Sequence, residues 1–323
     1  MSFTGLKLKL AAVFAGIAIA ILAAVIILGV SYYFLGVLPT SGFFVLIIGM
    51  VFVMDIIQYA ISPYIISKIY HLKPVRRDDM SMAWLYESLE KVCSLNNQKV
   101  PELFIADTDT PNAFAFGSII SGRRMAITRG LLKILNKDEI EAVMGHEIGH
   151  LRHHDVALLL AIGLIPTILF YFGYTMLFGS GRRNGGSIIL VAIALVAVSF
   201  VFNIMVLGVN RMRESYADFN SASTVPDAAN NLQTALAKIV AYSNANQRHH
   251  GFRRRSTTSS ISSMLMFSGD NDVKAYDHMD LLESWKRKKV TLKDSILSDH
   301  PHPAKRIQNL EKIKQENQTK GIL

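Results

Sequence analysis

Long apolar stretches alternate with polar segments along this chain of 323 residues, and several stretches are long enough to cross a bilayer. The four longest are residues 10–38, 43–66, 156–178 and 187–209. A helix needs about 20 apolar residues to span the hydrocarbon core. The pattern therefore predicts four transmembrane helices, the first two of which are joined into a hairpin by the short turn 39–42.

The first stretch has an alternative interpretation, because Lys7 and Lys9 precede it as basic residues precede the core of a signal peptide. Its length exceeds the roughly 7–15 residues of such a core, and no small-residue cleavage site follows it. We therefore expect a retained membrane anchor.

Most lysines and arginines that flank the predicted helices lie on the same side of the membrane. They are Lys7, Lys9, Lys68, Lys73, Arg76, Arg77, Arg211 and Arg213. Only Arg182 and Arg183 lie on the other side. Because cytoplasmic loops carry an excess of basic residues, we expect both polar segments to be cytoplasmic.

These features divide the chain into four parts. We expect a transmembrane hairpin at 1–66, a cytoplasmic part at 67–155, a second transmembrane hairpin at 156–209 and a cytoplasmic helical part at 210–323. The net charge of +9 fits contact with anionic lipid headgroups. Nucleic acid is the other partner that a basic chain suggests, but no recognition motif is present, so we expect none.

The polar segments combine helical and strand patterns, which predicts an α+β domain with a small sheet. Residues 79–95 have the pattern of an amphipathic helix, with the single cysteine, Cys93, as a small core residue. Short strands are predicted at 103–106, 113–116 and 125–127. Helices are predicted at 131–135, from 137 onward, and at 212–222, 226–243, 278–288 and 303–317. The Arg- and Ser-rich residues 244–263 suggest a loop that is either solvated or in contact with lipid.

The strongest chemical signal is the run His146-Glu147-Ile148-Gly149-His150. On a helix, positions four apart project toward the same side, so both imidazoles can bind one metal ion. Glu147 lies roughly 100° further round, where it can reach a water at the ion without binding the ion itself. Two nitrogen ligands and a general base are the parts of a hydrolytic zinc site.

A hydrolytic zinc site needs a third protein ligand and one open position. From His150 the chain runs about 33 residues to the turn near Arg183, and about 31 residues lead back to Glu214. Two helical arms of nearly equal length return Glu214 to the level of the histidines. We therefore expect one Zn²⁺ per chain, held by His146, His150 and Glu214. Asp218, one turn further along, can hold a ligand histidine through its free ring N–H.

Two late residues have more than one interpretation. His300 stands in the segment 299–303, whose prolines favour a fixed turn before a helix. His300 or Arg306 could stabilise a developing oxyanion. The residues alone are equally compatible with a structural role.

With these residues in place, the chain resembles the HtpX-type membrane zinc metallopeptidases, which are related to the CAAX-prenyl endopeptidases. The resemblance covers most of the chain and rests on the two amino-terminal apolar stretches and on residues 111–117, 127–132, 146–150, 214–218 and 300–306. It implies a mainly α membrane protein with four transmembrane helices and a cytoplasmic, gluzincin-like α+β metallopeptidase domain with a small sheet.

The resemblance also implies roles that spacing cannot show. One segment resembles the edge strand that binds a substrate backbone by strand addition, with Asn112 positioning the scissile region. The residues of this segment are Asn112, Ala113, Phe114 and Ala115. His300 and Arg306 match a late active-site pair. The implied activity is cleavage of polypeptides, chiefly damaged or misassembled membrane proteins, at the cytoplasmic face of the cell membrane.

Two other functions fit part of the pattern. An intramembrane protease would carry its zinc inside the bilayer, where the polar residues that flank the motif would be costly. These are Lys137, Asp138, Glu139, Arg152, His153, His154 and Asp155. A non-enzymatic, zinc-containing membrane adaptor or chaperone would normally close the fourth zinc position with Cys or His, and Cys93 lies outside the motif. We therefore expect a zinc endopeptidase.

Overall fold

The computed structural model describes residues 41–152, 155–179, 185–249, 277–291, 298 and 300–319. These residues form two compact units. The apolar unit comprises residues 41–61 and 155–212, and the polar unit comprises residues 62–152 and 213–319, within the described ranges. The first predicted membrane stretch, residues 10–38, lies outside the described part of the chain.

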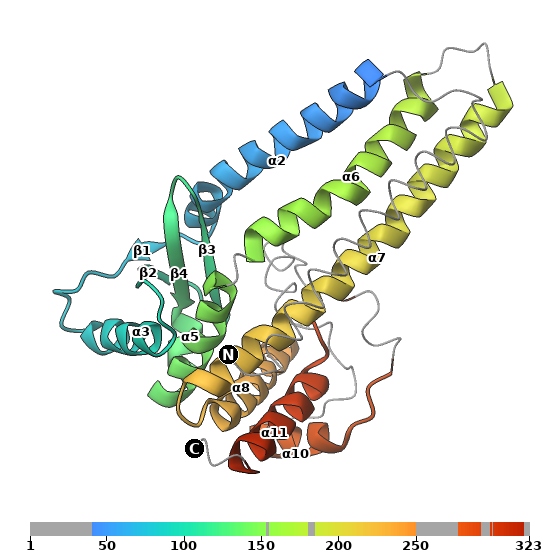
Figure 1. Ribbon diagram of the computed structural model, residues 1–323. Coiled ribbons are helices and arrows are strands. Elements are labelled where there is room, and N and C mark those ends of the chain that lie inside the picture. Colours follow the sequence, from blue (N-terminus) through green and yellow to red (C-terminus); the bar gives the residue numbers. More distant parts are fainter. Residues whose placement is uncertain are drawn as a thin grey trace. The chain divides into compact units, whose positions relative to one another are not determined.

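The apolar unit consists of long helices (Figure 1). They are α2 (Ser41–Ile69), α6 (Asp155–Gly179) and α7 (Gly185–Thr224), and α2 and α7 continue into the polar unit. Leu169 and Phe202 are buried among the helices, whereas Phe52 and Phe200 are exposed, as expected for a surface in contact with lipid.

Within the described ranges, three segments are long and apolar enough to cross a membrane. They are Ile48–Ile69, Leu158–Leu177 and Ile189–Thr224. By length and composition, these segments confirm the second, third and fourth predicted stretches as candidate spans.

Two predicted helix boundaries differ from the structure. The helix predicted at 212–222 is the last part of α7, a single helix of 40 residues that continues through Gly208. Residues 244–249, predicted as part of a loop, belong to the end of α8, and residues 250–263 lie outside the described part. A change from apolar to polar side chains does not by itself end a helix, because the backbone hydrogen bonds are the same on both sides of it.

The polar unit is built around a four-stranded sheet with the order β1-β2-β4-β3. Its strands are β1 (Lys73–Pro74), β2 (Glu102–Ala106), β3 (Ala113–Ser118) and β4 (Gly122–Thr128). β2 and β4 are parallel, and the other neighbours are antiparallel. The three strands predicted from sequence are present. β1 escaped prediction because it has only two residues, one of them proline. β3 lies at the edge of the sheet.

Six helices are described in full within the polar unit. They are α3 (Ala83–Leu95), α4 (Arg129–Ile134), α5 (Lys137–Arg152), α8 (Ala228–His249), α10 (His278–Arg287) and α11 (Pro303–Thr319). The main core is formed by α3, α5, α8 and the sheet, with Leu85, Ile127 and Met144 fully buried. Cys93 belongs to this core, as predicted, and burial raises the pKa of its thiol to about 12.

Polar contacts fix the start and two sides of α5. At its start, the Asn136 N–H donates to Glu139 and the Glu139 N–H donates to Asn136, each at 2.9 Å, which is a capping box. Glu139 also pairs with Lys238 of α8 at 2.7 Å. On the opposite side, Glu141 pairs with Lys91 of α3 at 2.6 Å. The helix that carries the zinc motif is therefore clamped between α3 and α8.

Candidate metal centre

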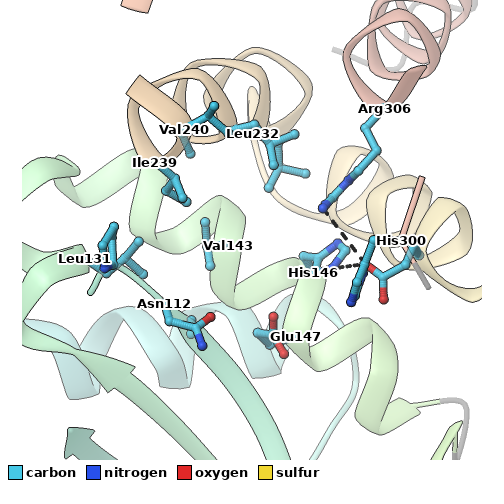
Figure 2. A pocket seen from close by; sticks show the side chains of 15 residues that line it. Asn112, Leu131, Val143, His146, Glu147, Leu232, Ile239, Val240, His300 and Arg306 are labelled. Atoms are coloured by element: carbon cyan, nitrogen blue, oxygen red, sulfur yellow. Dashed lines mark ion pairs between the residues drawn. The ribbon is translucent and has the colours of Figure 1, made fainter. Parts of the chain in front are cut away.

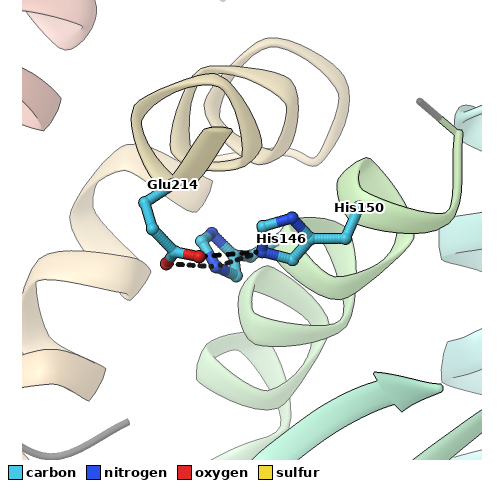
Figure 3. Close-up of side chains that lie close together, drawn as sticks. All are labelled: His146, His150 and Glu214. Atoms are coloured by element: carbon cyan, nitrogen blue, oxygen red, sulfur yellow. Dashed lines mark hydrogen bonds and ion pairs between the residues drawn. The ribbon is translucent and has the colours of Figure 1, made fainter. Parts of the chain in front are cut away.

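Three side chains from two helices converge at one point in the polar unit (Figure 3). His146 and His150 are one turn apart on α5, and Glu214 comes from α7. The Nε2 atoms of the two histidines lie 3.3 Å apart. The Glu214 carboxylate lies 3.6 Å from His146 Nε2 and 3.4 Å from His150 Nε2. These three residues could therefore hold one metal ion.

The spacing of these side chains is compatible with a tetrahedral zinc site. Zinc binds nitrogen and oxygen at about 2.0–2.1 Å, so ligand atoms at neighbouring corners of a tetrahedron lie about 3.3 Å apart. The two Nε2 atoms have this separation, and the two oxygens of Glu214 lie near them, Oε1 at 3.4 Å from His150 and Oε2 at 3.6 Å from His146. Two imidazoles and one carboxylate are also a common ligand set of hydrolytic zinc. The residues present fit the ion that the motif predicts.

Asp218 and Arg306 form a buried pair behind His146. Asp218 Oδ1 lies 2.9 Å from His146 Nδ1, the ring nitrogen that faces away from Glu214. Arg306 of α11 donates to the same carboxylate twice, from Nε at 2.9 Å and from Nη2 at 2.6 Å. A bidentate pair of this kind fixes the orientation of the carboxylate and, through it, the imidazole.

The carboxylates around His146 also change its proton affinity. Burial by itself lowers the pKa of His146, because it disfavours the charged imidazolium. The neighbouring carboxylates of Asp218 and Glu214 outweigh burial and raise the pKa to about 9. In the metal-free protein His146 is therefore protonated at neutral pH, and a metal ion must displace this proton.

We expect the apparent affinity for Zn²⁺ to rise about tenfold per pH unit up to pH about 9, since one proton leaves His146 on binding. Because the pKa is raised in the folded state, His146 stabilises the metal-free fold fully below its ordinary pKa of 6.5. This stabilisation is lost as the pH rises through about 9. Zinc titrations and thermal unfolding of the metal-free chain, each repeated across this pH range, measure both effects. A zinc affinity that does not change with pH in this range would contradict the expectation.

Glu147 lies between the metal centre and the edge strand. The backbone N–H of Ala115 in β3 donates to Glu147 Oε2 at 2.9 Å. This N–H points away from β4, so the open edge of β3 faces the carboxylate. His300, on the segment before α11, places its Nδ1 3.1 Å from Glu214.

The metal centre opens into a pocket with about 730 Å³ of space, including its mouth. Figure 2 shows His146, His300 and Arg306 at one end of this pocket. The other end is apolar and is lined by Leu131, Val143, Leu232, Ala235, Leu236, Ile239 and Val240. Asn112 and Glu147 lie between the two ends (Figure 2). The pocket therefore has room for an apolar group directly beside the ligand cluster.

α5 and α7 run antiparallel and contact one another at regular intervals. The successive pairs are Glu214 with His150, Asp218 with His146, and Ser221 with Ala142. Ser221 Oγ donates to the Ala142 carbonyl at 2.6 Å. The helices approach this closely because Gly145 has no side chain, and a Cβ there would come within 2.8 Å of Ser221 Oγ. The interval of three to four residues places all three α7 side chains on one face.

The structure brings together most of the residues that sequence analysis placed at the site. The exception is the side chain of Phe114, which lies against Tyr70 and Phe116 and does not line the pocket. Sequence analysis missed the apolar wall of the pocket, most of which comes from α8. The sequence did contain a signal for this wall, because Leu232, Leu236 and Ile239 recur at helical spacing. This spacing predicts that the side chains are buried, but it does not show that they line a pocket. It also missed the Arg306–Asp218 pair.

Comparison with known proteins agrees with this geometry. The model of peptidase family M48 matches residues 80–314. The chain is 49% identical over 315 residues to the protease HtpX homolog of Thermoplasma acidophilum, covering 97% of this chain and 99% of that protein. It is 52% identical over 318 residues to the protease HtpX homolog of Picrophilus torridus, with the same coverage of 97% and 99%.

The fold is also similar to that of a solved structure, the crystal structure of S. mikatae Ste24p. The TM-score is 0.56 at 17% sequence identity, over 95% of this chain and 67% of that chain. At this identity the similarity shows the fold alone. The family match covers most of the chain, and the two HtpX relatives align over nearly all of it. The resemblance drawn from the motifs is thereby confirmed, and the chain belongs to peptidase family M48 as a membrane-bound metalloprotease.

Proposed function

We propose that this metalloprotease is a zinc endopeptidase that cleaves membrane proteins at the cytoplasmic face of the cell membrane, in protein quality control. The observation that carries the zinc assignment is the convergence of His146, His150 and Glu214 beside Glu147 and the open edge of β3. The cytoplasmic face is supported by the placement of basic residues, and the substrate class by the family resemblance.

His146, His150 and Glu214 would hold one Zn²⁺ and leave a fourth position open. When bound, the ion supplies a Lewis acid that polarises the scissile carbonyl and makes water a better nucleophile. Glu147 then acts as the general base, which takes a proton from the attacking water and passes it to the leaving amine. Its carboxylate is already held by the Ala115 N–H, so it needs no large movement to act.

Asp218 and Arg306 act as positioning residues in this proposal. Asp218 holds the Nδ1 side of His146, which fixes the ring for metal binding. Two donors of Arg306 are engaged by Asp218, and its Nη1 lies 3.9 Å from Glu214. These contacts favour a role through the carboxylates over the oxyanion role considered from sequence. His300 lines the pocket, and we assign to this residue the stabilisation of the developing oxyanion.

The edge strand and Asn112 would hold the substrate backbone. Strand addition needs an open edge, and β3 provides one beside Glu147. Asn112 is fixed at the start of β3, because its N–H donates to Thr128 Oγ1 and its carbonyl accepts from the Thr128 N–H. Its buried side-chain Nδ2 has no hydrogen-bond partner among the described residues. A substrate carbonyl would satisfy this donor.

The apolar end of the pocket predicts a preference for a large apolar substrate residue next to the scissile bond. Val143 lies on the pocket wall three residues before His146. We expect Val143→Ala to raise kcat/KM for Phe relative to Leu at this substrate position by about tenfold, because the pocket becomes larger. Val143→Ile should shift the ratio the other way. Competition between two peptides that differ at one position measures the ratio, and a ratio unchanged in both variants would remove Val143 from the specificity pocket.

The proposed function is tested by cleavage of a membrane-embedded model protein by the full-length chain in vesicles. We expect a metal chelator to abolish cleavage and added Zn²⁺ to restore it. Cleavage should occur only when the site in the substrate and the basic loops of the enzyme are on the same side of the membrane. A chain that binds the substrate without cutting it would favour the adaptor or chaperone role.

A further inference from the structure

The turn between β3 and β4 has two isoleucines at its tip. Ile119 is 91% exposed and Ile120 is 73% exposed. Tight turns usually carry glycine or small polar residues at such positions. Two adjacent large apolar side chains at the end of a hairpin form a small apolar surface that stays exposed among the residues that the structure describes.

The two serines that flank the tip bond to each other. The Ser118 N–H donates to Ser121 Oγ at 2.9 Å, and the Ser121 N–H donates to Ser118 Oγ at 3.1 Å. Backbone groups that enter the hydrocarbon region need such partners, because water is not available there. The tip therefore combines two apolar side chains with flanking N–H groups that have partners within the turn, which favours entry into the surface of a membrane.

The hairpin points toward the membrane end of α2, and this direction can be followed within the polar unit. Tyr70, just beyond α2, lies against Phe114 of β3 with ring centroids 5.0 Å apart. Tyr64, further into the apolar segment Ile48–Ile69, contacts Arg124, the β4 partner of Phe116, at 5.9 Å. Tyr64 lies deeper in the apolar segment of α2 than Tyr70 does. In the hairpin, the partner of Tyr64 likewise lies nearer to the tip than Phe114, the partner of Tyr70. Figure 1 shows the hairpin beside the carboxyl-terminal end of α2.

We propose that Ile119 and Ile120 insert into the surface of the membrane that α2 crosses, so that the open edge of β3 leads from the bilayer to the metal centre. Ala115, whose N–H contacts Glu147, is four residues from Ile119, or about 13 Å along a strand. Arg123 and Arg124 follow the turn and stand where lipid phosphates would lie. If the proposed endopeptidase function holds, a polypeptide that pairs with β3 is cut a few residues beyond the point where it leaves the lipid.

Insertion of the tip is tested without any assay of cleavage. The full-length zinc-loaded chain is labelled at Ile119→Cys or, as the matched control, at Met80→Cys, because Met80 is an equally exposed apolar residue in another loop. Cys93 is buried and stays unlabelled. In vesicles of phosphatidylcholine and phosphatidylglycerol that carry brominated lipids, we expect severalfold stronger quenching of a fluorophore at 119 than at 80. Equal quenching would overturn the proposal, as would cross-linking of labelled tips between copies of the chain.

The guiding role of β3 is tested with the double variant Ile119→Ser, Ile120→Ser and with Met80→Ser as the control. We expect cleavage of a short soluble peptide to be unchanged and cleavage of a membrane-embedded substrate to fall about tenfold, with no effect of Met80→Ser. An equal loss on both substrates, or no loss on either, would overturn the guiding role. If the unmodified chain cleaves neither substrate, the proposed function fails, and the quenching result still decides whether the tip enters the membrane.

Discussion

Replacing Glu147 with glutamine should lower kcat for peptide cleavage by about 10²–10⁴-fold, because the residue that accepts the proton from water is lost. The fold should persist, since glutamine has the same shape and its side-chain oxygen can still accept the Ala115 N–H that Glu147 accepts at 2.9 Å. The zinc content should also persist, because Glu147 is not among the three clustered ligand residues. Single-turnover cleavage by the zinc-loaded variant in detergent or vesicles measures the loss.

The matched control for this experiment is Glu283→Gln on α10, where the carboxylate is on the surface and pairs with Lys286. This variant should cleave at the normal rate. Normal cleavage by the zinc-loaded Glu147→Gln variant would show that another group takes the proton.

The second large effect concerns the metal itself. Glu214→Ala should weaken Zn²⁺ binding by more than about 100-fold, because losing residues that merely support a ligand already costs 10–100-fold. The change removes one of three ligands and leaves Arg306 and His300 close to the vacated position. Elemental analysis after dialysis against a weak chelator measures the zinc content, and cleavage should fall in parallel.

Asp218→Asn provides an intermediate case for the same measurement. It keeps the three ligands but loses the charge that orients His146 and binds Arg306, so we expect a 10–100-fold loss of zinc affinity. A Glu214→Ala variant that retains one zinc per chain would exclude Glu214 as a ligand. If both variants lose zinc and circular dichroism shows that both chains are unfolded, the two residues have a purely structural role.

The central part of the site is predictable from sequence because it depends on short-range and regular geometry. The spacing of His146 and His150 places both on one helix face whatever surrounds the helix. The position of Glu214 follows from two helical arms of similar length. The three longer strands are marked by the apolar runs and turn residues that bound them.

The remaining features depend on contacts between segments that are distant in sequence. The bond between Arg306 and Asp218 joins residues 88 positions apart, and nothing in either local pattern selects this partner from the other acids. The apolar pocket arises where α8 lies beside α5, and helical periodicity does not identify the neighbouring helix. The direction of the β3–β4 turn follows from the contact of Arg124 with the Tyr64 ring and of Phe114 with the Tyr70 ring. No sequence pattern predicts either contact.

The regular pairing of α5 with α7 makes the chemistry intolerant of any change in helix length. Inserting or deleting one residue between Glu214 and Ser221 rotates one of them by about 100° relative to the other. The side chains of Glu214, Asp218 and Ser221 would then no longer face the same side. The metal ligand, the contact that supports His146 and the bond to the Ala142 carbonyl could not all form together. A substitution in this stretch alters one contact between α5 and α7, whereas the insertion or deletion of one residue removes several of these contacts at once.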